Sequence, residues 1–124
     1  MRFLSQRRCS VFCPALAKLQ LTQPPRSGCT TGTGYWAAIA AARKGAACIL
    51  MLNRKSGRAD AALAKVKAEA SGRVETVEVD LQSFASVKAA AAKVNAIAAE
   101  FGGLDALVNN AGIMAVPDHR TTDG

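Results

Sequence analysis

The fold is decided by a glycine-rich stretch, Gly28-Cys29-Thr30-Thr31-Gly32-Thr33-Gly34, and by the alanine-rich stretch that follows it at residues 35–44. Glycine lets the backbone turn sharply, and it lets N–H groups approach a phosphate with no Cβ in the way. The alanine-rich residues predict a short helix that ends at Gly45. A glycine turn that opens a helix favours a bound anion, because the helix N-terminus offers free N–H groups. On its own, the stretch is equally typical of a plain loop.

After this turn the chain alternates apolar strands with helices. Residues 47–52 are continuously apolar, which is typical of a parallel strand covered on both faces. Residues 74–79 alternate Val with Glu and Thr, which predicts a strand nearer an edge, and residues 104–108 form a third short apolar strand. Such strands, separated by helices, imply right-handed crossovers. The predicted fold class is therefore α/β, a Rossmann-like doubly wound parallel sheet.

Two further helices are predicted between these strands. The first covers residues 60–70 and is closed by Gly72. The second is expected to begin after Ser83, a favoured capping residue, and to end at two glycines. Their buried stripes are read from apolar residues at helical spacing. These residues are Leu63, Val66 and Ala70 in the first helix, and Val87, Ala91, Val94, Ile97 or Ala98, and Phe101 in the second.

Polar residues stand where each predicted strand ends. They are Asn53 and Arg54 after the first strand, Asp80 after the second, and the segment 109–112 after the third. In open α/β sheets, ligands bind outside the carboxyl ends of the strands. We therefore expect these residues and the glycine turn to share one binding edge.

Arg54 favours one nucleotide over another. It lies 20 residues after Gly34, at the place where dinucleotide-binding folds put the residue that reads the adenosine ribose. An acidic side chain there would bind the 2′-hydroxyl of NAD, whereas a guanidinium pairs with a phosphate in a bidentate way. The position thus favours NADP over NAD. The alternative is a solvated residue that merely follows a strand.

The net charge of +7 is concentrated at the head of the chain, because residues 1–26 hold five basic side chains and no acid. This composition predicts an organelle transit peptide or an unstructured extension, followed by one domain over residues 27–124. The body lacks a basic stripe with interleaved aromatics, so nucleic-acid binding is not predicted. No apolar run is long enough to span a membrane.

The cysteines predict neither a metal site nor a disulfide framework. Cys9, Cys13, Cys29 and Cys48 form no C-x-x-C pair, and His119 is the only histidine. Cys48 lies in an apolar run and is expected to be a small buried residue. A reducing compartment, cytoplasmic or organellar rather than secreted, is the expected location.

The glycine turn, Asp80-Leu81 and Asn109-Asn110-Ala111-Gly112, in this order and spacing, resemble the short-chain dehydrogenase/reductase family over residues 27–124. The segment 106–115 is most similar to its retinol dehydrogenase, WW-domain oxidoreductase and protochlorophyllide reductase branches. The resemblance implies hydride transfer between NADP(H) and a small alcohol or carbonyl. It also implies which residues contact the cofactor. These are Gly28, Thr30, Thr31, Gly32, Thr33 and Gly34 in the turn, Arg54, Asp80 and Leu81, and Asn110, Ala111 and Gly112.

The family's catalytic groups, a Ser and a Tyr-x-x-x-Lys pair, have no match in this sequence. The only tyrosine, Tyr35, is followed four residues later by Ile39. The chain is thus expected to be the incomplete, N-terminal half of such a domain and to be inactive alone. The alternatives are a non-catalytic nucleotide-binding module or a partner that contributes strands to another chain. Substrate and oligomeric state stay open.

Two departures from the family pattern concern the turn. The family enters it from an apolar strand, but Pro24 and Pro25 occupy that place here, and proline cannot donate to a central ladder. A regular strand directly before the turn is therefore not expected. Residues 16–21 offer a displaced strand that the spacing does not support. Thr33 stands where an apolar residue usually packs beneath the turn.

Overall fold

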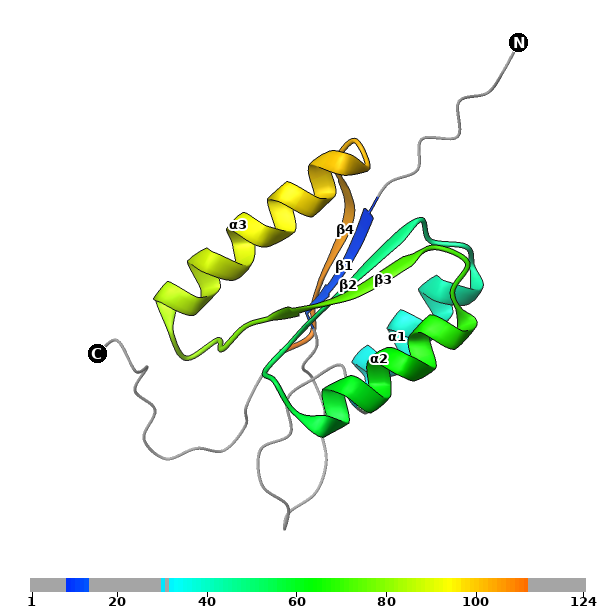
Figure 1. The fold of residues 1–124 in the computed structure, drawn as a ribbon, viewed down its shortest axis with the longest axis horizontal. Coiled ribbons are helices and arrows are strands. Elements are labelled where there is room, and N and C mark those ends of the chain that lie inside the picture. The colour runs from blue at the N-terminus through cyan, green and yellow to red at the C-terminus, as the bar shows by residue number, and fades with distance from the viewer. Residues whose placement is uncertain (1–8, 14–29, 31, 112–124) are drawn as a thin grey trace.

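A parallel sheet with helices on both faces makes up the described part of the protein. The computed structural model describes residues 9–13, 30 and 32–111. In Figure 1, α1 and α2 lie on one side of the sheet and α3 lies on the other. The described strands pair in parallel in the order β3-β2-β1-β4, which confirms the predicted α/β class. The elements are β1 (Cys9–Cys13), α1 (Gly32–Arg43), β2 (Cys48–Asn53), α2 (Gly57–Glu69), β3 (Arg73–Glu78), α3 (Phe84–Glu100) and β4 (Leu104–Asn109).

The strand β1 differs from the sequence expectation. It lies inside the basic head, upstream of both prolines and of residues 16–21, and it pairs with β2 on one side and β4 on the other. Proline disfavours a ladder next to the glycine turn, and in the described sheet the segment CSVFC supplies the strand. Residues 9–13 therefore belong to the sheet and not to an extension ahead of it. A targeting role for the head stays a prediction.

The core is built around β2, whose side chains are almost entirely buried. Ile49 and Met51 pack with residues of α1 and α2, whereas Cys48 and Leu50 pack with residues of α3. Because successive side chains of a strand point to opposite faces, one continuous apolar run fills both halves of the core. This confirms the prediction of a strand covered on both sides.

Serine caps fix where the second and third helices begin. The Ser56 hydroxyl accepts the Ala59 N–H at 3.2 Å, so α2 begins at Gly57, three residues earlier than expected. The Ser83 hydroxyl accepts the Ser86 N–H at 3.3 Å, which confirms the predicted cap of α3. Each cap satisfies one of the N–H groups that a helix start leaves unpaired.

The buried faces of these helices follow the expected stripes closely but not fully. Val66 of α2 is fully buried, and Leu63 and Ala70 pack beside it. In α3 the buried positions are Ala90, Val94, Ile97 and Ala98. The prediction for Ala91 is wrong, because this side chain is exposed and its neighbour Ala90 turns toward the sheet. Both alanines fit the helical spacing of the buried stripe, so only packing on the sheet decides which of them is buried.

The two outer strands of the described sheet differ in burial. In β3 only Val74 and Val77 are buried, and the strand lies at an edge of the described sheet, as the sequence predicted. The strand β4 is largely exposed, with Leu107 at 55%. Among the described residues, no helix is long and apolar enough to cross a membrane.

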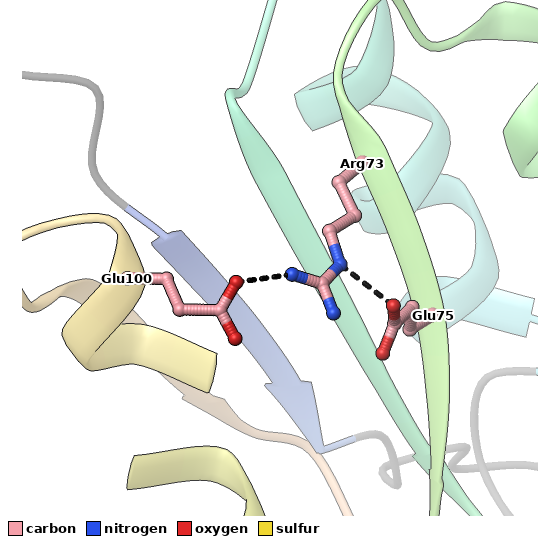
Figure 2. Close-up of polar contacts among 3 residues, drawn as sticks. All are labelled: Arg73, Glu75 and Glu100. Carbon is pink, nitrogen blue, oxygen red and sulfur yellow. Dashed lines mark hydrogen bonds and ion pairs between the residues drawn. The ribbon is translucent and has the colours of Figure 1, made fainter. Parts of the chain in front are cut away.

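A surface ion-pair cluster joins β3 to α3. The Arg73 guanidinium donates to Glu75 at 2.6 Å and to Glu100 at 2.7 Å (Figure 2). It also lies 6.0 Å from the centre of the Phe101 ring. These side chains are partly solvated, and exposed pairs contribute about 0–1 kcal/mol each. Because Arg73 begins β3, the cluster lies at the amino ends of the strands, away from the predicted binding edge.

Candidate functional site

The carboxyl ends of the strands meet at one edge, as predicted. Asn53 at the end of β2 pairs with Glu78 of β3, and Cys13 at the end of β1 pairs with Asn109 of β4. One residue further on, the Val79 N–H donates to the Asn53 carbonyl at 3.0 Å. The backbone therefore leaves β2, β3 and β4 at the same edge of the sheet.

The start of α1 presents a backbone open to an incoming group. Gly32 is the first residue of the helix, with a φ of 73° that side chains disfavour, and no described atom lies within 4 Å of where its Cβ would be. Helices leave their first N–H groups unpaired, and the first turn of α1 holds no acid. Thr33 is exposed and Gly34 is buried. Gly28 and Thr31 lie outside the described residues.

A cavity of about 320 Å³ lies between the start of α1 and the helix α2. Thr30 and Gly32 line it, and both were among the residues predicted from the sequence. Its other walls were not assigned to the site by the sequence analysis. They are Tyr35 and Trp36 of α1, and Arg58, Ala61, Ala62 and Lys65 of α2.

The cavity has a basic and aromatic character. Arg58 and Lys65 are seven residues apart on α2, which places them two turns apart on one helix face. Trp36 is 61% exposed, and its ring meets Tyr35 edge-on at a centroid distance of 5.2 Å. An exposed indole beside two cations suits an anionic ligand that carries an aromatic base. The seven-residue spacing was visible in the sequence, but the packing of α1 on α2 was not.

Arg54 lies where the sequence analysis placed it, directly after β2, and its side chain is exposed. Arg58 stands in the first turn of α2, four residues further along the chain. Between Asn53 and Arg58 the sequence holds no acid. All charged side chains in the segment that follows β2, from Arg54 to Arg58, are therefore positive.

Asp80 follows β3 and takes part in the turn that leads into α3. Its carboxylate accepts the Gln82 N–H at 3.0 Å, and its own N–H donates to the Ser86 hydroxyl at 2.9 Å. This is the local turn role that Asp commonly plays. Leu81 beside it is 50% exposed, which leaves its side chain available for an apolar contact. The predicted adenine contact of this pair stays a prediction.

The last predicted segment follows β4. Asn110 and Ala111 are half-buried just beyond the strand, and Gly112 lies outside the described residues. Among the described residues, no three metal-ligating side chains gather in one place. Tyr35 lines the cavity beside Gly32, at the glycine-turn end of the site.

Known proteins match this chain over most of its length. The short chain dehydrogenase family model matches residues 27–123. Retinol dehydrogenase 13 of Homo sapiens is 34% identical over 113 residues, which cover 90% of this chain and 33% of that protein. A 3beta-hydroxysteroid dehydrogenase of Mediterraneibacter gnavus is 36% identical over 88 residues, covering 71% of this chain and 30% of that protein.

A solved structure shows the same likeness in three dimensions. L-sorbose reductase from Gluconobacter frateurii, complexed with NADPH and L-sorbose, superposes with a TM-score of 0.63 and 29% sequence identity. The match covers 86% of this chain and 34% of that one. The chain thus spans about a third of the length of these three relatives. With a family model matched over most of its residues, the chain belongs to the short-chain dehydrogenase family.

Proposed function

We propose that this chain supplies the cofactor-binding part of an NADP-dependent oxidoreductase, which transfers hydride between the nicotinamide and a small alcohol or carbonyl. The observation that carries the proposal is the convergence of an open, acid-free helix start at Gly32 with the basic segment Arg54–Arg58 at one sheet edge. Membership of the family supports it, and so does the NADPH held by the sorbose reductase.

The described residues fit a dinucleotide phosphate. Free N–H groups in the first turn of α1 would bind the pyrophosphate, because the helix dipole and the donors both favour an anion there. No described atom lies within 4 Å of where a Gly32 Cβ would be, which supports that approach. Gly28, Thr30, Thr31, Thr33 and Gly34 complete the proposed phosphate turn.

Arg54 and Arg58 would hold the 2′-phosphate that distinguishes NADP from NAD. A guanidinium binds phosphate oxygens through paired, charge-assisted hydrogen bonds. Both side chains are exposed, and no acid between them opposes the phosphate. Lys65 lies further along the cavity wall and adds to the positive field.

The remaining edge residues would hold the adenine and the nicotinamide side of the cofactor. Asp80 and Leu81 follow β3, next to the exit of β2, and are proposed to contact the adenine. Asn110, Ala111 and Gly112 follow β4 and are proposed to lie along the cofactor. The bound nicotinamide supplies the hydride chemistry. No Ser or Tyr-x-x-x-Lys set accompanies it here, so we propose that the chain alone does not turn over substrate.

Trp36 provides the experiment, because it is the only tryptophan and it lines the cavity. We expect its fluorescence to change on titration with NADPH and with 2′,5′-ADP, and to change much less with NADH and with 5′-AMP. Free N-acetyltryptophanamide, titrated in parallel with the same ligands, corrects for their absorption. Equal responses to the phosphorylated and unphosphorylated ligands would contradict the NADP assignment, and no response to any of them would contradict the site.

A further inference from the structure

Two cysteines from different strands lie side by side in the core. Cys9 begins β1 and Cys48 begins β2, and the two are direct partners in the parallel register. Both are free thiols with no exposed surface, and their side chains are hydrogen-bonded to each other. They lie at the amino ends of the strands, opposite the proposed cofactor edge. Nothing in the proposed function uses them.

The backbone places the two cysteines within the span of a disulfide. Neighbouring strands lie about 4.8 Å apart, and disulfides join Cα atoms that are about 4.4–6.8 Å apart. The pairing of β1 with β4 shifts register between Cys9 and Ser10, so the ladder is irregular beside Cys9. Both residues are also the first of their strands, where a ladder opens most readily.

We propose that Cys9 and Cys48 are a modification site, at which a reversible disulfide fastens β1 to β2. The bond would matter because β1 is central in the described sheet, yet a long segment of chain separates it from α1. A cross-link between β1 and β2 restricts the unfolded chain and holds the strand in place. Under reducing conditions the same two residues are small buried core residues.

The surroundings of the two thiols differ. Burial raises the pKa of both thiols, while the hydrogen bond from Cys48 and the nearby Arg73 guanidinium oppose that rise at Cys9. Burial and the Cys9 hydrogen bond raise the pKa of Cys48 to about 12. The thiolate is the attacking form, and the folded surroundings oppose it less at Cys9, so we write the exchange with Cys9 as the attacking sulfur.

The oxidant is a small disulfide such as oxidised glutathione. The Cys9 thiolate breaks its S–S bond, forms a mixed disulfide and releases one glutathione thiolate. The Cys48 sulfur then displaces the second glutathione and forms the Cys9–Cys48 bond. The two cysteines lose two protons and two electrons, which end on two glutathione thiols. Because both thiols are buried, the first attack waits for the strand starts to open.

The test uses the full chain with Cys13→Ser and Cys29→Ser, which leaves Cys9 and Cys48 as the only thiols. The folded protein is equilibrated with oxidised and reduced glutathione, alkylated and digested with trypsin. We expect one cross-linked product, which joins the peptide of residues 9–18 to that of residues 45–54, and its loss on treatment with dithiothreitol. Thiols that stay free, or that end as mixed glutathione adducts, would overturn the proposal.

Urea unfolding of the same protein, oxidised and reduced, supplies a second readout that needs no substitution of Cys9 or Cys48. We expect oxidation to raise the midpoint, and dithiothreitol to restore the reduced value. A cross-link that forms only at urea concentrations above the reduced midpoint would also overturn the proposal, because it would belong to the unfolded chain. The same holds for an oxidised protein with a lower midpoint than the reduced one.

Discussion

The backbone N–H of Val79 donates to the carbonyl of Asn53 at 3.0 Å, so the chain leaves β2 and β3 side by side. This one bond brings together the polar residues that follow the two strands, Arg54 and Asp80, although they are 26 positions apart in the sequence. In parallel sheets such an edge is where ligands bind. The nucleotide assignment depends on this geometry more than on any single side chain.

Arg54→Ala should weaken binding of 2′,5′-ADP to the chain by roughly ten- to hundredfold, which is the loss of a charge-assisted hydrogen bond. Binding of 5′-AMP should change little, because that ligand lacks the 2′-phosphate. Lys88→Ala is the matched control, since it removes one exposed positive charge from α3 on the other face of the sheet. The Trp36 titration measures all three proteins. Equal losses for both ligands would show that Arg54 does not read the 2′-phosphate.

The next prediction concerns an enzyme in which this segment is joined to the rest of a complete family domain. In that enzyme, Arg54→Asp should reverse the preference for NADPH over NADH. The carboxylate repels a 2′-phosphate and accepts a hydrogen bond from a 2′-hydroxyl. The ratio of kcat/KM for NADPH to that for NADH measures the change. Equal use of both cofactors by the unmutated enzyme would contradict the NADP proposal.

Gly72→Ala should destabilise the fold by about 1–3 kcal/mol or more, because the added methyl has no room. Its Cβ would meet the backbone carbonyl of Ala46 and lie 2.5 Å from that of Ala47, at the start of β2. Gly57→Ala is the control, since no described atom lies within 4 Å of its Cβ and its φ is ordinary. Urea unfolding should place Gly57→Ala within about 1 kcal/mol of the parent. Similar losses of stability in both variants would contradict the close approach of Gly72 to the carbonyls of Ala46 and Ala47.

The ion pair between Arg43 and Glu69 should make stability depend on acid pH. The guanidinium donates to both carboxylate oxygens, at 2.9 and 3.1 Å, and these bonds lower the pKa of Glu69. A lowered folded pKa gives stability that is present above the unfolded value of about 4.3 and is lost as the pH falls through the folded pKa. Both groups are exposed, so the effect is small and screened by salt.

The measurement follows the urea midpoint as a function of pH for the parent, Glu69→Gln and Glu78→Gln. Glu69→Gln should reduce the fall of the urea midpoint at acid pH, because it removes the carboxylate that Arg43 holds. Glu78→Gln is the matched control, since it makes the same change of charge at an exposed residue of β3. It should leave the fall of the midpoint at acid pH unchanged. The same fall of the midpoint with acid pH in the parent and in Glu69→Gln would show that the ion pair does not contribute to stability.

Much of the fold could be predicted because local patterns and the tertiary structure agree. The continuous apolar run of β2, the alternation of β3 and the cap at Ser83 each have one physical interpretation. The strand β1 could not be placed, because a short apolar segment inside a basic head carries no signal that it pairs with β2 and β4. The choice of Ala90 over Ala91 likewise depends on the sheet beneath α3.

The site was predictable only in its outline. The polar residues after the strands were found because parallel strands bring their carboxyl ends together. The cavity walls Trp36, Arg58 and Lys65 were not assigned to the site, because only the packing of α1 on α2 brings them to Gly32. Asp80 lies at the predicted edge, and its carboxylate also accepts the Gln82 N–H in the turn that leads into α3, a bond that the strand pattern does not predict.

The most direct test of the account is to map where 2′,5′-ADP binds, by following backbone amide NMR signals of the isotope-labelled chain during a titration. We predict that the largest shifts fall on Gly32, Gly34, Arg54 and Arg58, with smaller ones at Asp80 and Leu81. The amino-end residues Arg73 and Glu100 should stay unmoved and serve as an internal control. Shifts that gather around Arg73, or no shift at the start of α1, would contradict a cofactor site at the carboxyl edge of the sheet.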